Sequence, residues 1–555
     1  MIPPPVKLST PTSEDIPSAS HGATYLSAPD CVFKRKPTLF IPKRCSIRTQ
    51  KRLLFLVTSE TTTIRLEELA RSVAVDWRIQ IAFTIPEPRS KNCICLEPLI
   101  QKLGLPYVPW QCAIREPFDL AICASILEER PELNTTLLML SHGPGHTKTI
   151  SHPQTSENHR DWLEDRKNPK ARRIIGTVNQ AEANLFSKSC ETFVIGDPVF
   201  DSLIRSAHRK EEFKRTLGAE GKHLVVLSST WHDNSLIGSL PDITQMLLSR
   251  YPYDEYAFAL LLHHFVWDAH SRWQINTWLK QSLRAGLILI EPERSWQAAV
   301  LAADLFIGDY GSVSLYANLL GMPCCLIGAT EDNLNREYAI VNATKSAFHA
   351  QKYEHIEAFI ENPKIRPEEE TARIREEAFA HMGDSNRILS LKIYELLGLD
   401  WNEAACTPIA LSSPSFQHEE PRSFFIVLSK NENGLYDAKR YPASIPPNNG
   451  EGILISNSDE SNYRVLTNCS GIVLQTTEAE RWWREQAPFA DFALQYTSGR
   501  YMAIDRDGRQ ALLPEQAEKQ PECALGAFIL ARRLGTPVQI CLHTGERICI
   551  DARSL

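Results

Sequence analysis

Residues whose side chains could do acid–base chemistry follow one of the short apolar runs of the sequence. After Leu137–Leu140 comes a loop with two imidazoles, two glycines and an ammonium group, Ser141-His142-Gly143-Pro144-Gly145-His146-Thr147-Lys148. Histidine is the side chain best able to take a proton from a hydroxyl near neutral pH. His142 or His146 is therefore a candidate general base, unless the loop is a turn whose polar residues are incidental.

Three later apolar runs are also followed by unusual polar residues. These segments are, in chain order, Ser228-Ser229-Thr230-Trp231-His232-Asp233, His263-His264 with Trp267, and Gly308-Asp309-Tyr310-Gly311-Ser312. A serine that opens a helix can cap it, and the free N–H groups of the same helix end can bind a phosphate. For Ser312 both roles stay open. A histidine pair at a strand end is more often buried and hydrogen-bonded than part of a binding site.

The apolar runs have the length of strands and alternate with segments whose apolar residues recur at helical spacing. The expected strands are Leu53–Thr58, Ile79–Thr84, Leu120–Cys123 and Leu137–Leu140 and, after a polar stretch over 152–173, Leu224–Leu227, Phe258–Leu262, Leu287–Ile290, Leu305–Ile307 and Cys325–Ile327. The expected helices are Ile64–Val73, Ile243–Arg250, Ile275–Arg284, Trp296–Ala303 and one long charged tract, Glu368–Leu397, with Gly398 as its C-cap. Continuous apolar strands alternating with helices predict parallel sheets covered on both faces.

These patterns predict a fold class and a division into domains. We expect an α/β protein with two successive doubly wound, Rossmann-type units, followed by a C-terminal α+β domain. The last domain is expected because the sequence pattern changes after about residue 402 to strand-like and turn-rich segments. The expected divisions are an N-terminal arm over 1–50, a first unit over 51–215, a second unit over 216–400, a linker over 401–422 and the tail domain over 423–555. Ligands of such sheets bind in the crevice at the carboxyl ends of the strands, so the four polar loops are expected at one crevice.

Composition limits the class of protein. The 555 residues are more than a single hydrophobic core holds, and 60 Lys plus Arg against 67 Asp plus Glu leave a net charge of −7. This balance argues against a general nucleic-acid coat, so we predict no nucleic-acid partner and expect any anionic ligand to be held locally. Residues 1–30 lack the apolar stretch of a signal peptide, which favours a cytoplasmic protein.

The fourteen cysteines are scattered along the chain, and we expect them to be reduced. Neither Cys93/Cys95 nor Cys324/Cys325 has the two-residue spacing that lets both thiolates reach one zinc ion. We therefore predict no metal site and no cofactor.

Residues 34–52 are a local exception to the acidic balance, because they contain eight Lys or Arg residues and no acid. One interpretation is a solvated arm ahead of the first strand. The other is contact with an anionic lipid surface or acceptor polymer, which would place the protein peripherally at the inner face of a membrane.

The order of the motifs resembles the CDP-glycerol glycerophosphotransferases of teichoic-acid synthesis, which have a GT-B fold. That family has a His-Gly-Thr-Pro-x-Lys loop, a Gly-x-Pro-x-x-Asp segment, a Pro-Thr-Trp-Arg-Asp segment, a His-Pro step and an Asp-Tyr-Ser-Ser turn. The chain has, in the same order, His142-Gly143 with Lys148, Gly196-Asp197-Pro198-Val199-Phe200-Asp201, Ser229-Thr230-Trp231-His232-Asp233, His263-His264 and Asp309-Tyr310-Gly311-Ser312. The resemblance spans roughly residues 50–400 and leaves the leader and the tail uncovered.

The resemblance implies roles for individual residues. It makes His142 the general base toward the acceptor hydroxyl and His263 the histidine that contacts the donor diphosphate. It matches Ser312 to the last serine of the Asp-Tyr-Ser-Ser turn, and Arg336 is a candidate for the family's downstream phosphate-binding arginine. We predict that the donor and its phosphates also contact Thr230, Asp309, Gly311, Lys148 and His232. The first unit would hold the acceptor and the second unit the nucleotide donor.

The chain also departs from the family pattern. Pro144-Gly145 replaces Thr-Pro, His232 replaces the arginine, His264 replaces the proline and Gly311 replaces a serine. These departures affect the identity of the donor more than the fold. The leading hypothesis is a GT-B transferase that moves an alcohol phosphate or a sugar from a nucleotide-diphosphate donor, a CDP-alcohol or a nucleotide sugar, to a hydroxyl acceptor. The alternatives are a catalytically diverged nucleotide-binding or regulatory protein and an enzyme like the nucleotide-sugar epimerases.

Overall fold

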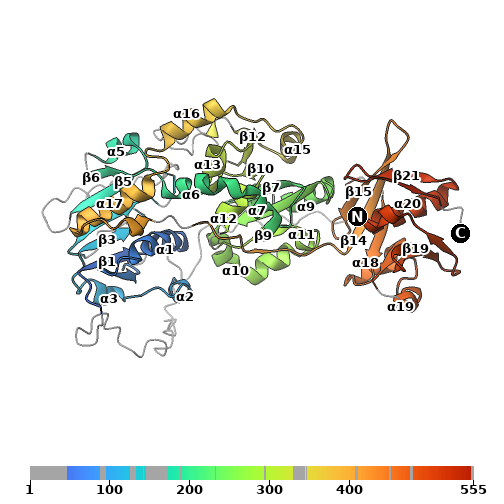
Figure 1. The fold of residues 1–555 in the computed structure, drawn as a ribbon, viewed down its shortest axis with the longest axis horizontal. Coiled ribbons are helices and arrows are strands. Elements are labelled where there is room, and N and C mark those ends of the chain that lie inside the picture. Colours follow the sequence, from blue (N-terminus) through green and yellow to red (C-terminus); the bar gives the residue numbers. More distant parts are fainter. Residues whose placement is uncertain are drawn as a thin grey trace, which may run out of the picture. The chain divides into compact units, whose positions relative to one another are not determined.

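The computed structural model describes most of the chain after residue 46. The described residues are 47–87, 96–125, 133–141, 143–144, 172–187, 190–231, 233–292, 295–328, 344–345, 347–406, 410–448, 452–475 and 479–551. Within these ranges the strands form three sheets, which follow one another along the sequence (Figure 1).

The first sheet is parallel throughout and has the strand order β2-β1-β3-β4-β5-β6. Its strands are β1 (Lys51–Leu56), β2 (Ile79–Thr84), β3 (Leu120–Cys123), β4 (Thr136–Leu140), β5 (Arg173–Thr177) and β6 (Glu191–Val194). Helices in this part of the chain are α1 (Glu60–Ala74), α2 (Glu97–Lys102), α3 (Trp110–Ala113), α5 (Gln180–Phe186) and α6 (Pro198–Ser206). Helix α1 starts directly after β1 because Ser59 caps it and Thr62 completes a capping box.

The second sheet has the order β12-β11-β10-β7-β8-β9-β13, in which only β13 is antiparallel to its neighbour. Its strands are β7 (His223–Ser229), β8 (Tyr256–Leu262), β9 (Ile288–Ile290), β10 (Leu305–Gly308), β11 (Cys324–Ile327), β12 (Phe348–Ala350) and β13 (Phe416–Gln417). The helices in this part of the chain are α7 (Lys210–Thr216), α8 (Leu236–Ser239), α9 (Ile243–Arg250), α10 (His264–Trp278), α11 (Lys280–Arg284), α12 (Trp296–Ala302), α13 (Ser312–Leu319), α15 (Tyr353–Glu361), α16 (Glu368–Ala378) and α17 (Ser385–Leu397). Of these, α17 packs on the first sheet. Short 3₁₀ turns occur at Ala207–Arg209 and Glu403–Cys406.

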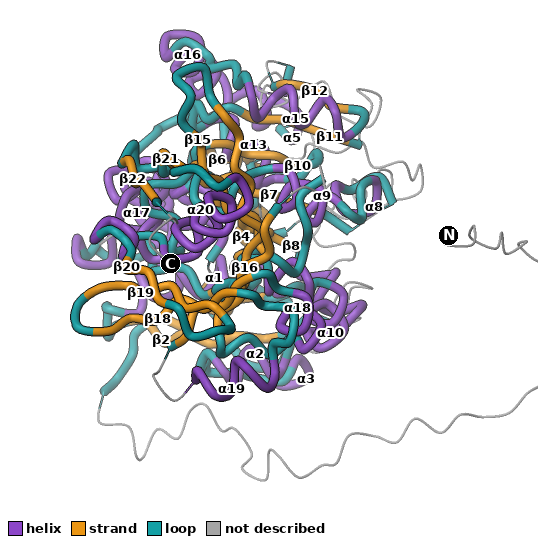
Figure 2. The backbone as a smooth tube through the Cα atoms, turned by 90° about the vertical axis from the view of Figure 1, so that its right-hand side faces the viewer, coloured by secondary structure: helices purple, strands orange, loops and turns teal. Residues whose placement is uncertain are grey.

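The third sheet is mixed and has the order β20-β19-β18-β17-β16-β14-β15-β21-β22. Its strands are β14 (Ser423–Lys430), β15 (Tyr436–Pro442), β16 (Ile453–Asn457), β17 (Gly471–Leu474), β18 (Phe492–Thr497), β19 (Arg500–Asp505), β20 (Gln510–Leu512), β21 (Val538–Cys541) and β22 (Arg547–Ile550). Its helices are α18 (Tyr463–Asn468), α19 (Ala479–Gln486) and α20 (Pro521–Leu534), with a 3₁₀ turn at Glu515–Glu518. Helix α20 packs into one core cluster of this sheet and Trp483 of α19 into another, so the sheet is covered on both faces (Figure 2).

The predicted fold class is confirmed. Two doubly wound parallel sheets follow each other and a separate α+β sheet completes the chain. The apolar strands are buried on both faces, as their continuous apolar runs predict; Leu53, Phe55 and Leu56 of β1, for example, have no exposed surface. Phe416–Gln417, in the segment expected as a linker, adds β13 to the edge of the second sheet.

Strands β5, β6 and β12 were not predicted from the sequence. Strand β5 is a five-residue run, Arg-Ile-Ile-Gly-Thr, and β6 is a four-residue strand at the sheet edge that is only partly buried. Strand β12 has three residues and lies at the edge of the second sheet. None of the three has the longer apolar run on which the prediction depended.

The prediction of one helical tract over Glu368–Leu397 was wrong, because the tract is divided into α16 and α17. The backbone between them reverses through His381 (φ 51°) and Gly383 (φ 86°), and Asp201 of α6 accepts hydrogen bonds from the N–H groups of Gly383 and Ser385 at 2.6 and 2.8 Å. The break lets the chain return from the core of the second sheet to that of the first, where Ile393 of α17 is fully buried. The predicted C-cap is confirmed, since Gly398 is left-handed at φ 62°.

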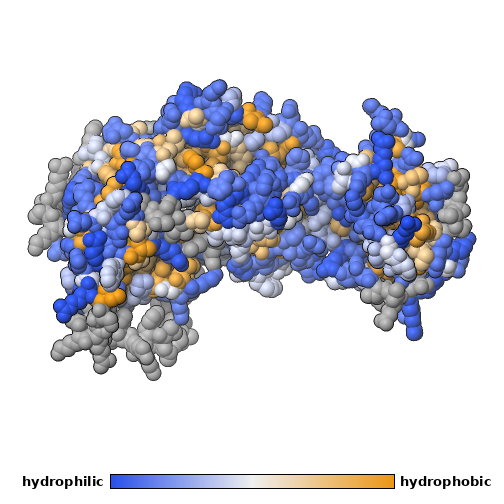
Figure 3. Space-filling model, in the orientation of Figure 1, coloured by the Kyte–Doolittle hydropathy of each residue, from blue (hydrophilic) through white to orange (hydrophobic). Residues whose placement is uncertain are grey.

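Polar residues predominate on the face of the molecule shown in Figure 3, with apolar residues in small groups among them. Among the described helices, none is both long enough and apolar enough to cross a membrane.

A buried group of charges joins the second and third sheets. Arg440 of β15 donates to Asp254, just before β8, at 2.9 Å, and to Glu522 of α20 at 3.0 Å. The Arg440 side chain is 16% exposed and both acids are 9% exposed. Burial alone would raise the pKa of Asp254, but the hydrogen bonds and the charge of Arg440 outweigh it and hold that pKa below its ordinary value. Asp254 is therefore a charged carboxylate whose main partner is this guanidinium.

We expect Arg440→Met to lower the free energy of unfolding by about 3–5 kcal/mol, because it leaves two buried carboxylates without their cation. Urea-induced unfolding followed by circular dichroism measures the change. Arg481, which is 90% exposed in its pair with Glu485, provides the control, and Arg481→Met should change the stability by less than about 0.5 kcal/mol. Equal effects of the two substitutions would contradict the structural role of Arg440.

Candidate functional site

The second sheet reverses its strand order at β7. From β7 the chain continues outward through β8 and β9 on one side and then returns to β10 and β11 on the other side. The carboxyl ends of the two strands that flank such a reversal form the crevice where doubly wound sheets bind their ligands. The residues that follow β7 and β10 are Thr230 and Asp309.

Asp309 holds the two loops of this crevice together. Its side chain is buried, and its Oδ2 accepts hydrogen bonds from the Thr230 N–H at 2.7 Å, the Thr230 hydroxyl at 3.0 Å and the Leu236 N–H at 3.1 Å. Leu236 is the first residue of α8. One carboxylate oxygen thus sets the path of the chain after β7, so Asp309 has a structural task at the site.

Helix α13 starts at this crevice. Its N-cap is Gly311, and Ser312 is the first helical residue. Of the two roles that the sequence left open for Ser312, capping is therefore excluded. A Cβ atom at position 311 would lie 2.9 Å from Cγ2 of Thr230, so a larger residue there would displace Thr230. Gly311 has no side chain with which to cap the helix, and the exposed Ser312 begins it. The N–H groups and positive dipole end of α13 are therefore suited to an anion.

His263 follows β8, the neighbour of β7. Its N–H donates to the carbonyl of Ser229 at 3.0 Å, and its Nδ1 accepts from the N–H of Phe265 at 3.2 Å, which caps α10. Because Nδ1 accepts, the proton of the neutral imidazole is on Nε2, which can donate to a ligand oxygen. The indole of Trp231 packs on the ring of His263 with centroids 4.2 Å apart.

His264 connects the histidine pair to the first sheet. Its Nδ1 lies 3.2 Å from the hydroxyl of Thr61, which is in the first turn of α1. Both histidines are half-buried. The pair is hydrogen-bonded to its surroundings, as is usual for such pairs, and it is also at the strand ends where the sequence analysis expected a site.

The loop after β4 reaches the start of α13. Its Ser141 hydroxyl donates to the Gly143 carbonyl at 2.8 Å, and a Cβ atom on Gly143 would lie only 3.5 Å from Cβ of Ser312. The two loops come from different sheets. The carboxyl ends of both sheets therefore share one crevice, as the sequence analysis predicted.

The structure brings together some of the predicted site residues and leaves others undescribed. Thr230, Asp309, Gly311 and Ser312 are in mutual contact or adjacent, and His263 lies on the neighbouring strand end. His142, His146, Lys148, His232 and Arg336 lie outside the described residues. His142 is flanked by Ser141 and Gly143, which are described. Within the described ranges no group of three or more His, Cys, Asp or Glu side chains is placed to hold a metal ion.

The sequence analysis missed the corresponding reversal in the first sheet. There the chain order reverses at β1, between β2 and β3. The hydroxyls of Thr58 and Ser125, which follow β1 and β3, lie 3.2 Å apart at this point. Thr58 ends one expected strand and Ser125 lies two residues after another, but nothing in the sequence shows that these strands are neighbours.

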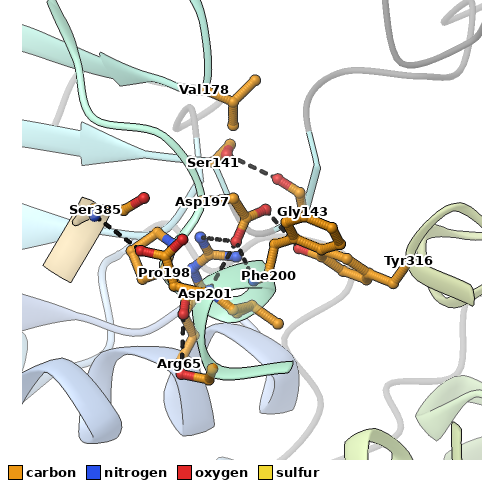
Figure 4. A network of polar contacts seen from close by, with 12 residues as sticks. Arg65, Ser141, Gly143, Val178, Asp197, Pro198, Phe200, Asp201, Tyr316 and Ser385 are labelled. Atoms are coloured by element: carbon orange, nitrogen blue, oxygen red, sulfur yellow. Dashed lines mark hydrogen bonds and ion pairs between the residues drawn. The ribbon is translucent and has the colours of Figure 1, made fainter. Parts of the chain in front are cut away.

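A second group of polar residues, also missed, surrounds Asp197 at the start of α6 (Figure 4). The Asp197 carboxylate caps α6 by accepting from the N–H groups of Val199 and Phe200 at 2.8 and 3.2 Å, and it accepts from the Tyr316 hydroxyl at 2.7 Å. Arg65 of α1 lies 3.9 Å from it. Burial and the charge of Asp197 raise the pKa of Tyr316, so the phenol keeps its proton and donates it. Tyr316 is on α13, so this group anchors the candidate anion-binding helix.

A cavity of about 150 Å³ lies next to this network and is lined by Arg65, Glu68 and Ser141, among others. Burial raises the pKa of Glu68 from 4.5 to about 7, although the charge of Arg65 opposes the shift. Glu68 is therefore largely protonated below neutral pH.

Known proteins were compared with the chain and with its structure. No family model and no curated protein matches the sequence. Among solved structures, the wall teichoic acid polymerase TagF is similar to the chain at 13% identity and a TM-score of 0.38, over 63% of this chain and 89% of that chain.

Two further solved structures show the same kind of similarity. MnaA of S. aureus, in complex with UDP, is 11% identical with a TM-score of 0.40, over 62% of this chain and 97% of that chain. HepE of Anabaena, in complex with UDP and glucose, is 15% identical with a TM-score of 0.34, over 63% of this chain and 100% of that chain.

We expect Asp309→Leu to destabilise the protein by about 2–4 kcal/mol, because it leaves the buried N–H groups of Thr230 and Leu236 without an acceptor. Asp309→Asn keeps an acceptor oxygen and should cost less, about 1 kcal/mol. The exposed Asp233 gives the control, and Asp233→Asn should stay within about 0.5 kcal/mol of the unchanged protein in thermal unfolding. A small effect of Asp309→Leu would show that the crevice loops do not depend on this carboxylate.

Glu68 should make the stability depend on pH. Its pKa is higher in the folded chain than its ordinary value, so between pH 4.5 and about 7 the folded state binds more protons than the unfolded state. The contribution of Glu68 to the free energy of unfolding is thus fully present at low pH. It falls by up to about 3 kcal/mol as the pH rises across that window. Glu68→Gln removes this contribution, so the difference in unfolding free energy between the variant and the unchanged protein should grow in favour of the variant from pH 5 to pH 8. Parallel pH profiles of the two proteins would contradict the shift.

Proposed function

We propose that the chain is a transferase that moves an alcohol phosphate or a sugar from a nucleotide-diphosphate donor to a hydroxyl acceptor. The observation that carries the proposal is the crevice itself. The uncapped start of α13 at Gly311 and Ser312 lies at the strand-order reversal of the second sheet, and the loop after β4 of the first sheet reaches it. Such a crevice offers N–H groups to a diphosphate from one sheet and room for an acceptor beside the other.

On this proposal the second sheet binds the donor. The first turn of α13 and the Ser312 hydroxyl contact a donor phosphate, and His263 donates from Nε2, because its Nδ1 is occupied by the Phe265 N–H. Thr230, Asp309 and Gly311 hold the shape of this crevice, and we include Lys148, His232 and Arg336 among the donor-binding residues. Transfer of this kind needs hydrogen-bond donors or cations near the oxygens where negative charge grows in the transition state. The N–H, hydroxyl, imidazole, ammonium and guanidinium groups of these residues can supply them.

The first sheet, on the same proposal, presents the acceptor. Ser141 and Gly143 are the neighbours of His142 in the sequence, and a Cβ atom on Gly143 would lie 3.5 Å from Cβ of Ser312, which supports His142 as the general base. Its imidazole would take the proton of the acceptor hydroxyl. We further propose that the protein works in the cytoplasm and that residues 34–52 contact an anionic surface when the acceptor is membrane-bound.

The donor is tested with a thermal-shift panel of CDP-glycerol, CDP-ribitol and UDP-sugars. A donor at a hundred times its Kd should stabilise the folded state by about 2.7 kcal/mol and raise the Tm accordingly. His263→Ala should raise the ligand concentration that gives the same shift about tenfold, because the variant lacks a charge-assisted hydrogen bond to the donor. His270→Ala, exposed on the same helix α10, is the matched control and should leave the shift unchanged.

The nucleotide that is released then distinguishes transfer of an alcohol phosphate from transfer of a sugar. Release of CMP indicates attack at phosphorus, and release of a nucleoside diphosphate indicates glycosyl transfer. His142→Ala should keep the thermal shift and lower kcat by at least about a hundredfold. A flat response across the whole panel would exclude every donor in it, binding without product would favour a regulatory nucleotide-binding protein, and an epimerised sugar would favour an epimerase.

A further inference from the structure

Two aromatic residues follow the neighbouring strands β7 and β8 at their carboxyl ends. The strands are parallel and are paired as far as Ser229 and Leu262, so Trp231 and His263 come just after the last paired residues. The N–H of His263 extends the pairing by donating to the carbonyl of Ser229 at 3.0 Å. Both residues therefore lie at the edge of the sheet where doubly wound proteins bind their ligands.

The indole of Trp231 is held in place by two other rings. The ring of His263 packs against it with centroids 4.2 Å apart and planes tilted by 41°, and the ring of Phe265 meets it edge-to-face at 5.0 Å. Tilted and edge-to-face arrangements are those that aromatic pairs favour. His263 is itself fixed, because its Nδ1 accepts from the N–H of Phe265 at 3.2 Å. The protein alone therefore sets the plane of the indole.

The Trp231 side chain is nevertheless open to solvent. It is 38% exposed, whereas Trp267, four residues after His263, is only 8% exposed. The indole N–H of Trp267 donates to the carbonyl of Leu262 at 3.3 Å, and the guanidinium of Arg272 lies over its ring. Trp267 thus has the burial and the polar partner that a tryptophan of the core has. Trp231 instead presents a fixed aromatic surface.

This surface adjoins the groups that we propose for the donor phosphates. Thr230, which precedes Trp231, contacts the start of α13, since a Cβ atom on Gly311 would lie 2.9 Å from its Cγ2. Consecutive Cα atoms are about 3.8 Å apart, so Trp231 is close to that helix start as well. Its other neighbour is the His263 ring, whose Nε2 we propose as a donor to the diphosphate. In a nucleoside diphosphate a single ribose separates the phosphates from the base.

We propose that Trp231 is the base-stacking residue of the donor site. The base of a nucleoside diphosphate packs on the exposed part of its indole while the phosphates reach His263 and the first turn of α13. The inference rests on the proposed function and deepens it, because it assigns the part of the crevice that binds the nucleoside. Every base has an aromatic face, so this contact strengthens binding of CDP and UDP alike and does not select between them.

The test compares ligands that differ only in the base. CDP and UDP are titrated into the full-length protein by isothermal titration calorimetry, and so is ribose 5-diphosphate, which has the same phosphates and sugar without a base. The unchanged protein should bind CDP and UDP about five- to a hundredfold more tightly than ribose 5-diphosphate, the usual range for one stack of a base on an aromatic ring.

Three variants assign the difference to one residue. Trp231→Leu should raise the Kd of CDP and of UDP by about the same five- to a hundredfold and leave the Kd of ribose 5-diphosphate unchanged. Trp231→Phe keeps an aromatic ring and should retain most of the affinity for CDP. Trp273→Leu, which removes a tryptophan that is 73% exposed on α10, is the matched control and should change none of these constants. Near-ultraviolet circular dichroism checks that each variant is folded.

Two results would overturn the inference while the donor site stands. Equal affinity of the unchanged protein for CDP and ribose 5-diphosphate would exclude a base-stacking contact, and this comparison holds even if a variant fails to fold. Equal weakening of CDP and ribose 5-diphosphate in Trp231→Leu would show that the indole serves only to hold His263.

Failure of the proposed function has a different signature. If none of the three ligands binds the unchanged protein, the crevice is not a site for nucleotide diphosphates, and both proposals are overturned. If all three bind and the affinities do not depend on the base, the base-stacking inference alone is overturned.

Discussion

The carboxylate of Asp197 is the interaction on which the arrangement of the candidate site depends. It caps α6, the helix that leads from the first sheet toward the second, and it accepts a hydrogen bond from Tyr316 of α13. Arg65 of α1 lies beside it. Three helices from two sheets therefore meet at one buried charge, and removing it would leave the phenol, the helix start and the guanidinium without their common partner.

Close approach of backbone segments is the second constraint. Gly196, which precedes Asp197, has φ +90°, and a Cβ atom there would lie 2.2 Å from the carbonyl oxygen of Ala380. Only glycine allows this contact, which brings the chain between α16 and α17 against the end of β6. Asp201, one turn into α6, accepts the N–H groups of Gly383 and Ser385. The Gly-x-Pro-x-x-Asp segment thus has an architectural role, attaching the returning chain to the first sheet.

Much of the fold could be predicted because it depends on local patterns. Strands such as Ile79–Thr84 and Leu120–Cys123 are continuous apolar runs, and their bounds in the structure are those of the prediction. Short edge strands such as Glu191–Val194 could not be found, because this strand is only partly buried and therefore lacks a continuous apolar run. The division of the 368–397 tract was also hidden, since its cause is a pair of hydrogen bonds to Asp201, far away in sequence.

The sequence by itself determined which residues follow the strands, because the pattern of apolar runs is a local property of the chain. Thr230, His263, Asp309 and Ser312 could be named as a group for that reason. Only the tertiary structure decided that Asp309 ties Thr230 to the start of α8, that Gly311 rather than Ser312 occupies the N-cap position of α13, and that Gly143 of the first sheet reaches Ser312 of the second. These contacts depend on strand order and on the packing of distant segments, and spacing along the chain does not encode either of them in a form that can be read residue by residue.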